Sequence, residues 1–272
     1  MSEAASAADA FDAVADMFDT RFGAWLSVAA QRRAVRDELL HAFPRGSRLL
    51  ELGGGTGEDA AFLESEGREV LLTDPAPNMI VRAGGKVAPE RTRLLFAEDV
   101  GTLADERTAD GLPPFDGAFS NFAGLNCVGD LAPVAAGLHR LIRPDGQIVL
   151  VLFGTLCPGE MLVEALRGRF RNVLRRCRRG EVPASLGGRG FTVRYHTAAD
   201  VRRAMAPWFS LEARTAIGLF VPPSAAEPWI SRHPRLLARL EALDARLARP
   251  LAPLGDHVLY RLRRRPGDGG TR

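Results

Sequence analysis

One segment of the chain combines residue types that suit a bound nucleotide. Glu51 is followed at alternate positions by Gly53, Gly55 and Gly57, after an apolar pair and before a run that favours a helix. Glycine lets the backbone turn sharply and leaves no Cβ between the main chain and a ligand. Free amides at the start of a helix favour polar or anionic ligand groups. The pattern therefore predicts a strand, a glycine turn and a helix that together hold a nucleotide-like cofactor.

The spacing of these glycines distinguishes two kinds of cofactor. Counted from Gly53, the dinucleotide pattern G-x-G-x-x-G needs a third glycine where this chain has Glu58. Counted from Gly55, the third position is Ala60, so only a looser form of that pattern is met. The order E-x-G-x-G-x-G instead resembles the first motif of the class I S-adenosylmethionine-dependent methyltransferases. The resemblance implies that S-adenosylmethionine is the cofactor and that Glu51 helps hold its methionine part.

A second carboxylate lies at the end of the next expected strand, 69–74. Asp74 at this place can accept hydrogen bonds from the two hydroxyls of a ribose, as in other adenosine-binding sheets of this kind. Pro75 and Met79 follow it, and the resemblance makes them candidates for the apolar slot around the adenine. The alternative is structural, with Asp74 as a helix cap and Met79 in the core.

Further segments resemble the same family in the same order. The segment 115–121 is similar to its "FD" entry to a fourth strand, and 140–146 is similar to its R-x-L-K-P-G-G turn, with Asp145 in place of a glycine. Many relatives place an acid after the third strand, near the adenine amino group. Either Glu98 or Asp99 fills that position here, because the alignment is ambiguous by a residue or two.

The acceptor is expected at the carboxyl end of the fourth strand, where ligands of open α/β sheets bind. Asn121 is a candidate for the methionine end of the cofactor and for orienting a substrate, and Asn126 is a candidate for the substrate alone. Phe122 is expected to border the methyl-transfer channel. A purely structural role is the alternative for each of the three.

Transfer of a methyl group from a sulfonium is an in-line displacement that depends mainly on alignment and on excluding water. A hydroxyl or ammonium acceptor calls for a general base, whereas a thiolate, enolate or neutral amine does not. His196 is the first candidate for that base, because it precedes a helix beside the expected substrate cover; a structural histidine is the alternative. His139 is a weaker candidate, and Cys127 is assigned to packing, since no covalent enzyme intermediate is needed.

These residues require strands that end at one edge of a sheet. Strand and helix patterns alternate along the chain, which predicts a doubly wound α/β fold with a parallel sheet. The resemblance implies seven strands with the last one antiparallel, N-terminal helices that pack over the cofactor, and an inserted helical cover. The expected parts are an N-terminal helical region (1–46), the cofactor-binding core (47–154), the substrate cover (155–196), the C-terminal part of the core (197–264) and a disordered tail (265–272).

The expected cover has the most individual sequence. A helix is predicted over 159–179, with one apolar stripe and many arginines around it. The arginines either attract an anionic substrate or form a solvated helix face. After a flexible connector at 187–190, the pattern predicts a helix at 198–205 capped by Thr197, a strand at 208–217, helices within 225–247 and a last strand at 257–262.

Composition narrows the class of protein further. The 272 residues are 46% hydrophobic with a formal charge of +3, which is ordinary for a globular protein and too small to define a partner. No apolar run approaches the ~20 residues of a membrane span, and the first residues lack the pattern of a secretory signal. Three scattered cysteines suit neither a disulfide framework nor a zinc site, so we expect no metal and a reducing cytoplasm.

The expected function is methyl transfer from S-adenosylmethionine to a small organic acceptor, with an anionic acceptor as one alternative. An NAD-dependent oxidoreductase, a methyltransferase acting on RNA or protein, and a non-catalytic cofactor-binding protein are the competing classes. Nucleic acid is the less favoured partner, because no N-P-P-Y or similar base-methylation tetrapeptide is present. The sequence does not determine the oligomeric state.

Overall fold

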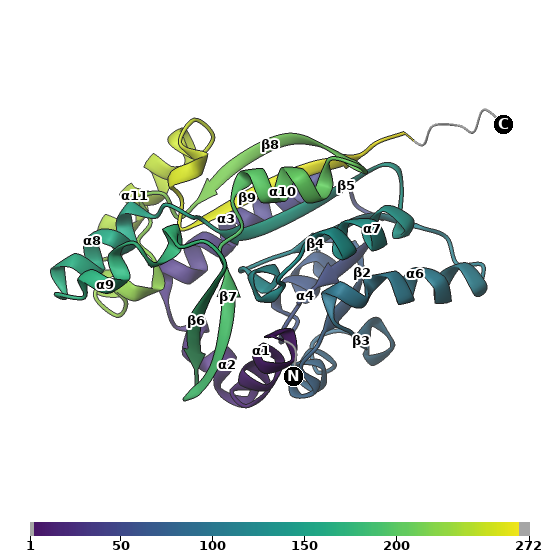
Figure 1. Ribbon diagram of the computed structural model, residues 1–272, viewed down its shortest axis with the longest axis horizontal. Coiled ribbons are helices and arrows are strands. Elements are labelled where there is room, and N and C mark those ends of the chain that lie inside the picture. Colours follow the sequence, from purple (N-terminus) through teal and green to yellow (C-terminus); the bar gives the residue numbers. More distant parts are fainter. Residues whose placement is uncertain (1–2, 267–272) are drawn as a thin grey trace.

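A seven-stranded sheet forms the centre of the molecule (Figure 1). The computed structural model describes residues 3–266. Its strand order is β3-β2-β1-β4-β5-β9-β8, in which the first five strands are mutually parallel and β9 is antiparallel to both neighbours. The strands are β1 (Arg48–Leu52), β2 (Glu69–Asp74), β3 (Thr92–Leu94), β4 (Phe115–Ser120), β5 (Ile142–Phe153), β8 (Phe209–Ile217) and β9 (His257–Arg264). The predicted doubly wound sheet with an antiparallel last strand is confirmed.

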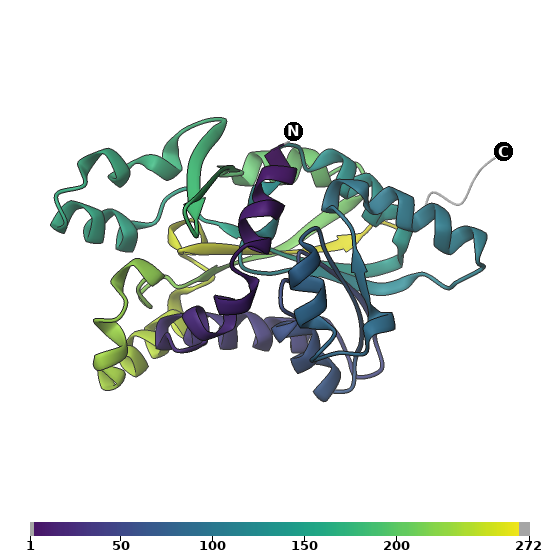
Figure 2. The same ribbon diagram turned by 90° about the horizontal axis from the view of Figure 1, so that it is seen from below.

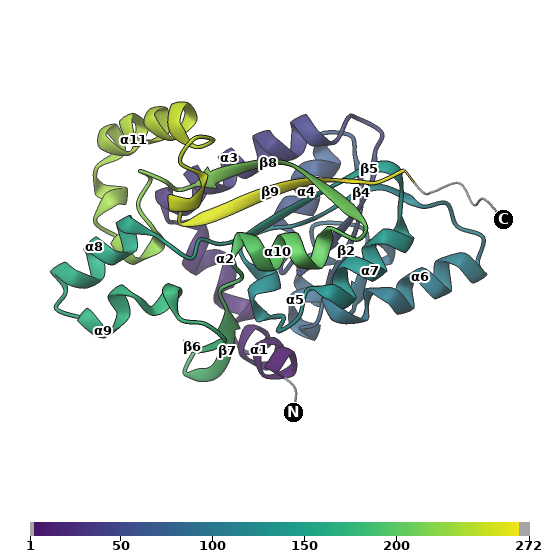
Figure 3. The same cartoon turned by 45° about the horizontal axis from the view of Figure 1, so that its top comes forward.

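Alternation of side chains along the strands creates a core on each face. In β1, Leu50 belongs to one apolar cluster and its neighbour Leu49 to the other. Successive residues of a strand point to opposite faces, so an apolar parallel strand needs helices on both. One face carries α6 (Val100–Ala109), α7 (Ala132–Leu141) and α10 (Ala198–Met205), and the other carries α3 (Leu26–Ala42), α4 (Glu58–Ser65) and α5 (Pro77–Ala83). Figure 3 shows α3 and α4 on the opposite side of the sheet from α7 and α10.

The strand order reverses between β1 and β4, and two N-terminal helices lie at that place. They are α1 (Glu3–Asp12) and α2 (Ala15–Gly23). α1 contacts α5 on one side and the inserted hairpin on the other. In Figure 2 α1, in dark purple, crosses the middle of the view. The carboxyl ends of β1, β2 and β4 are thus covered by chain that precedes the sheet in sequence.

The expected flexible connector at 187–190 is wrong, because this segment turns a β-hairpin. Strand β6 (Glu181–Leu186) pairs antiparallel with β7 (Arg189–Arg194). The two residues between them, Gly187 and Gly188, have φ of 58° and 82°. Two successive left-handed glycines make the tight turn that matches the twist of paired strands. The hairpin packs against α1, where the Phe11 and Phe191 rings have centroids 5.8 Å apart.

The single helix expected over 159–179 is also wrong. The segment forms α8 (Pro158–Leu166) and the short α9 (Phe170–Val173), and the chain turns between them at Gly168 with φ of 70°. The expected apolar stripe faces solvent, since Leu166 is 79% exposed and Phe170 is 74% exposed. The buried side chains of this segment are charged ones, Glu160 and Arg176 among them. Paired charges rather than apolar periodicity therefore fix the segment to the core.

Elements near the end of the chain agree with expectation. Thr197 caps α10 through a reciprocal capping box with Asp200, and α11 (Pro234–Leu247) lies within the expected helical region. The predicted turn at 144–146 is a bulge inside β5, where Asp145 has φ of 62°. Within 3–266, no helix is long and apolar enough to cross a membrane. The tail predicted at 265–272 lies, apart from its first two residues, outside the described chain.

Candidate functional site

The glycine loop between β1 and α4 forms one wall of a cavity. Gly53, Gly55 and Gly57 have φ of 65°, 56° and 82°, a region that favours glycine. A Cβ on Gly54 would lie 2.5 Å from Cγ of Leu72, so this position also excludes a side chain. A Cβ on Gly57 would lie 3.2 Å from a backbone carbon of α5. Gly57 therefore serves helix packing, while Gly53 and Gly55 border the cavity.

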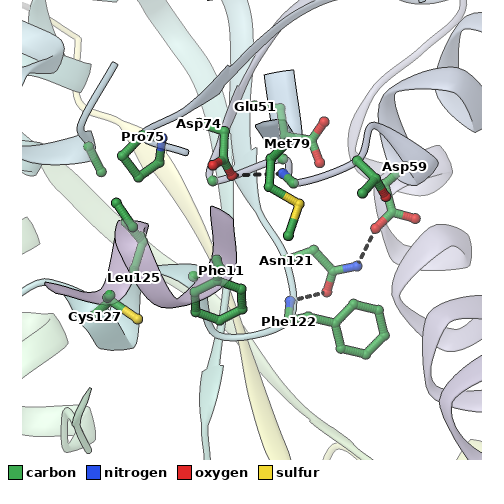
Figure 4. Close-up of a pocket in the computed structure, with 18 of the residues that line it drawn as sticks. Phe11, Glu51, Asp59, Asp74, Pro75, Met79, Asn121, Phe122, Leu125 and Cys127 are labelled. Carbon is green, nitrogen blue, oxygen red and sulfur yellow. Dashed lines mark hydrogen bonds between the residues drawn. The ribbon is translucent and has the colours of Figure 1, made fainter. Parts of the chain in front are cut away.

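This cavity of about 1000 Å³ opens at the carboxyl ends of β1, β2 and β4, and we call it the β1–β2 cavity (Figure 4). It lies at the reversal of strand order, where open α/β sheets bind ligands. Nine predicted site residues line it: Glu51, Gly53, Gly55, Asp74, Pro75, Met79, Glu98, Asn121 and Phe122. Its wall includes Ala97 and Glu98 but not Asp99, so the geometry favours Glu98 over Asp99 for a ligand contact.

Glu51 places a carboxylate in the wall of the cavity at the end of β1. Its exposed fraction is 2%, and its Oε2 atom has no hydrogen-bond partner among the described residues. Burial raises the pKa of Glu51 well above its ordinary value, and the nearby carboxylate of Asp59 raises it further. A buried polar atom without a partner costs free energy that a ligand donor can recover. The site is thus suited to an amino group.

Asp74 ends β2 on the other side of the loop. Its Oδ2 accepts a hydrogen bond from the amide of Gly55 (2.8 Å), and its Oδ1 accepts one from the amide of Ala76 (2.9 Å). Burial raises the pKa of Asp74 to about 6, against the lowering effect of these amides. Each oxygen keeps a second lone pair with which to accept from a vicinal diol. Met79 is 1% exposed, as a core residue would be, and it also borders the cavity.

A buried ion network behind the loop holds Asn121. Asp59 accepts hydrogen bonds from Nε of Arg36 (2.8 Å) and from Nδ2 of Asn121 (2.7 Å), and Arg32 lies 3.2 Å from its Oδ2. Asn121 accepts through Oδ1 from the amide of Phe122 (2.7 Å). The sequence motifs did not reveal Asp59; its one signal was an acid in the first turn of the helix after the glycine loop. The network fixes the end of β4 relative to α4.

Helices α1 and α2 are attached over the β1–β2 cavity by polar contacts. Asp12 accepts from the backbone amide of Asn78 (2.6 Å), and Asp19 accepts from the hydroxyl of Thr56 (2.6 Å). Lys86 also lies 2.5 Å from Asp19. Burial acts to raise the pKa of Asp19, but the hydrogen bonds from Lys86 and Thr56 lower it below its ordinary value. The helices thereby bring aromatic rings to the cavity wall from the start of the chain.

A second cavity, of about 1290 Å³, lies against the hairpin, and we call it the β6–β7 cavity. Phe11, Phe18, Arg32, Phe122 and Cys127 line both cavities, so the two adjoin. The backbone at the junction is unusual, because Phe122 and the alanine after it have φ of 46° and 62°. Such conformations are costly outside glycine and persist where the surroundings enforce them. The Arg32 guanidinium lies 4.8 Å from the centroid of the Phe122 ring.

The predicted substrate ligand Asn126 and the predicted base His196 both lie outside the two cavities. Asn126 is fully buried, donates through Nδ2 to the carbonyl of Arg194 (2.6 Å) and accepts through Oδ1 from the amide of Phe153 (2.9 Å). His196 is 3% exposed, and its Nε2 lies 2.9 Å from the carbonyl oxygen of Val128. Burial lowers the pKa of His196. These contacts are structural, and the geometry gives no support to Asn126 as a substrate ligand or to His196 as the base.

Cys127 and His139 have the modest roles expected of them. Burial raises the pKa of the Cys127 thiol to about 12, which leaves it a poor nucleophile. His139 stacks on Trp208 with ring centroids 4.3 Å apart and does not line either cavity. Across residues 3–266, no group of three or more His, Cys, Asp or Glu side chains is arranged to hold a metal ion.

The strand order, the glycine loop and the two carboxylates define an α/β protein with a site for an adenosine-containing cofactor. Residues 50–148 match a family model described as a methyltransferase domain. The chain is 32% identical over 152 residues to the malonyl-[acyl-carrier protein] O-methyltransferase of Serratia marcescens (55% of this chain, 54% of the relative). It is 35% identical over 140 residues to the demethylmenaquinone methyltransferase of Beutenbergia cavernae (50% and 52%).

The fold is similar to that of the S-adenosylmethionine-dependent methyltransferase from Mesorhizobium loti, with a TM-score of 0.52 and 20% identity over 86% of this chain and 98% of that one. The chain spans about half the length of the curated relatives it matches. Residues 50–148 therefore match a methyltransferase domain, and the chain shares its fold with solved S-adenosylmethionine-dependent methyltransferases.

Proposed function

We propose that this protein transfers the methyl group of S-adenosylmethionine to a small organic acceptor. The observation that supports this most strongly is the buried Oε2 atom of Glu51, which has no partner among the described residues. The amino group of a methionine part would supply the missing donor. The pyrophosphate of a dinucleotide would instead meet a carboxylate of like charge, which is unfavourable in a buried site. The unpaired Oε2 atom of Glu51 thus favours S-adenosylmethionine over a dinucleotide, the other cofactor class that binds to sheets of this kind.

The other cavity residues fit the rest of the cofactor. Asp74 would accept from the ribose hydroxyls, and Pro75 and Met79 would border the adenine. Glu98 is half-buried, with its pKa raised by burial, and would meet the adenine amino group. When bound, S-adenosylmethionine supplies an electrophilic methyl group on a positively charged sulfur. The protein's part is then to align the acceptor and keep water out.

The β6–β7 cavity is the place that we assign to the acceptor, because it adjoins the cofactor site at Phe122. The segment 155–196 would cover it, chiefly through the hairpin. Arg32 lines both cavities and would pair with an anionic substituent on the acceptor. Arg175 and Arg176 offer less, since both are paired with Glu160. The two curated relatives are named for a malonyl-[acyl-carrier protein] and a demethylmenaquinone, which agrees with an acceptor other than nucleic acid.

Calorimetry with S-adenosylhomocysteine and with NADH tests this proposal. We expect a saturable heat with S-adenosylhomocysteine and none with NADH under the same conditions. Binding of NADH alone would reverse the cofactor assignment. Binding of S-adenosylhomocysteine without its release from S-adenosylmethionine across a broad panel of acceptors would favour a non-catalytic binding protein.

A further inference from the structure

His257 lies in the wall of the β6–β7 cavity and had no role in the sequence motifs. It is the first residue of β9, pairs with Phe153 of β5 and is 5% exposed. Its ring stacks on Phe153 with centroids 4.8 Å apart and meets the edge of Phe122 at 5.8 Å. Because Phe122 lines both cavities, His257 stands next to the point where they join. Packing on two sides fixes the orientation of the imidazole.

The charges around His257 hold its ring from one side. Its Nδ1 lies 3.5 Å from Oδ2 of Asp256 and has no hydrogen bond within the described chain. Asp256 is itself held by Nη2 of Arg176 (2.7 Å) and by Nε2 of Gln31 (3.2 Å). Arg176 also pairs with buried Glu160. With Nδ1 directed to this network, Nε2 is the ring nitrogen left to meet a ligand.

The protonation state of His257 suits a base. Burial is the largest influence and lowers its pKa, while Asp256 and Glu160 act to raise it and Arg176 to lower it. The ring is therefore neutral at neutral pH and free to accept a proton. A general base must be unprotonated when the acceptor arrives.

The walls of the cavity indicate the kind of acceptor. Aromatic rings come from α1, α2, β5, β7 and the residue after β7, and they include Phe11, Phe18, Phe153, Phe191 and Tyr195. Aromatic side chains pack best against other flat rings, by stacking or by edge-to-face contact. A planar aromatic molecule with one polar edge fits this lining, since the network of Asp256, Arg176, Gln31 and Glu160 lies beside His257 in the cavity wall.

We propose that the β6–β7 cavity binds an aromatic hydroxyl compound and that His257 is the catalytic base that removes its hydroxyl proton. This inference rests on the proposed function and names the acceptor class of that same site. The O–H bond breaks as the proton moves to Nε2 of His257. The oxygen keeps the electron pair and forms a bond to the sulfonium methyl carbon as the C–S bond breaks, which leaves neutral S-adenosylhomocysteine. The imidazolium then loses its proton to solvent, while Asp256 and Arg176 act as positioning residues.

The direct test uses 4-nitrophenol, which is coloured as the phenolate and nearly colourless as the phenol. The full chain loaded with S-adenosylhomocysteine is titrated with it at a pH about one unit below the pKa of the free phenol. We expect the wild-type complex to bind the probe and to increase the phenolate absorbance. His257→Asn and His257→Gln should bind S-adenosylhomocysteine as the wild type does and should not increase that absorbance. This readout does not depend on turnover.

Turnover gives a second measurement. With S-adenosylmethionine and 4-nitrophenol, formation of the methyl ether should fall by about 10²-fold in His257→Asn, the range for losing a general base. The wild-type rate should rise with pH through the pKa of His257, whereas the rate of the variants should follow only the ionisation of the free phenol. His196→Asn is the matched control, because it also removes a buried histidine but lies outside both cavities. Its phenolate signal and its rate per folded molecule should be unchanged.

Three results would overturn the inference. They are no binding of 4-nitrophenol at about 1 mM, where even weak specific binding shows, bound probe that stays protonated in the wild type, and an equal phenolate signal in the His257 variants. A failure of the proposed function has a different signature, because S-adenosylhomocysteine would then not bind to the wild type at all.

Discussion

Replacing Glu51 by Gln should have opposite effects on cofactor binding and on the stability of the free protein. The substitution keeps the shape of the side chain and removes a charge that is buried and unpaired at Oε2. The cofactor would lose a charge-assisted hydrogen bond, worth about 1.5–3 kcal/mol. The affinity for S-adenosylhomocysteine should fall by about 10- to 100-fold. Calorimetry on both proteins measures this loss.

The free protein should gain stability from the same substitution. An unsatisfied buried group costs about 1–3 kcal/mol, so relief of about 1 kcal/mol should raise the melting temperature by roughly 2–4 °C at neutral pH. This gain in stability should depend on pH, because the pKa of Glu51 differs between the folded and the unfolded protein. Because the pKa of Glu51 is raised in the folded state, wild-type stability is greatest below the ordinary glutamate pKa of 4.5 and is lost as pH rises through the raised pKa. Glu51→Gln should lack this loss.

Glu90→Gln is the control, because it removes the same charge from an exposed position. Its melting temperature and affinity should match the wild type. The reasoning on Glu51 is refuted if Glu51→Gln binds S-adenosylhomocysteine as tightly as the wild type. It is also refuted if the melting temperatures of the two proteins differ by the same amount at about pH 4, below the ordinary pKa of a glutamate, and at about pH 8.

Three further changes test other parts of the site. Asp74→Ala should weaken S-adenosylhomocysteine binding by about tenfold or more in calorimetry, and wild-type affinity should fall as the pH drops below about 6, where Asp74 becomes protonated; an unchanged affinity removes the ribose assignment. Gly54→Ala should lower the melting temperature, since its Cβ would lie 2.5 Å from Cγ of Leu72 and overpacking costs about 1–3 kcal/mol; a melting temperature equal to the wild type would show that the loop adapts. Arg176→Met leaves Asp256 buried without its guanidinium partner and Glu160 with Arg175 alone, so denaturant unfolding should show a loss of about 3–5 kcal/mol; a loss under 1 kcal/mol would contradict the buried network.

The inserted segment shows where sequence periodicity misleads. The spacing of its apolar residues predicted one buried stripe, yet Leu166 and Phe170 face solvent. The segment is attached instead by Arg176, whose partner Asp256 is 80 residues away in sequence. A single sequence without its contacts cannot pair those charges, because their separation along the chain carries no local signal. The glycines at 187 and 188, in contrast, did carry a local signal, since adjacent glycines between two short strands are typical of a hairpin turn.

The same distinction applies to the candidate bases. The place of His196 before a helix predicts a base, but in the fold its Nε2 lies 2.9 Å from the carbonyl oxygen of Val128. His257 opens the last strand, where its place in the sequence gave no hint of chemistry. Pairing of β9 with β5 brings it beside Phe153, and the turn after β4 brings Phe122 to its other side. Only a long-range strand pairing could reveal that position.

The sequence by itself determined the cofactor half of the site. Glu51, Gly53, Gly55 and Asp74 lie on two successive strand ends, and their chemistry depends on local turns that short motifs specify. Tertiary structure alone decided the β6–β7 cavity, which we propose as the acceptor site. Its walls combine α1, the end of β4, the hairpin and the start of β9, which meet only because the sheet order places β5 between β4 and β9. Local backbone preferences can be inferred from neighbouring residues, whereas a cavity wall assembled across more than two hundred residues is fixed by packing of the whole chain.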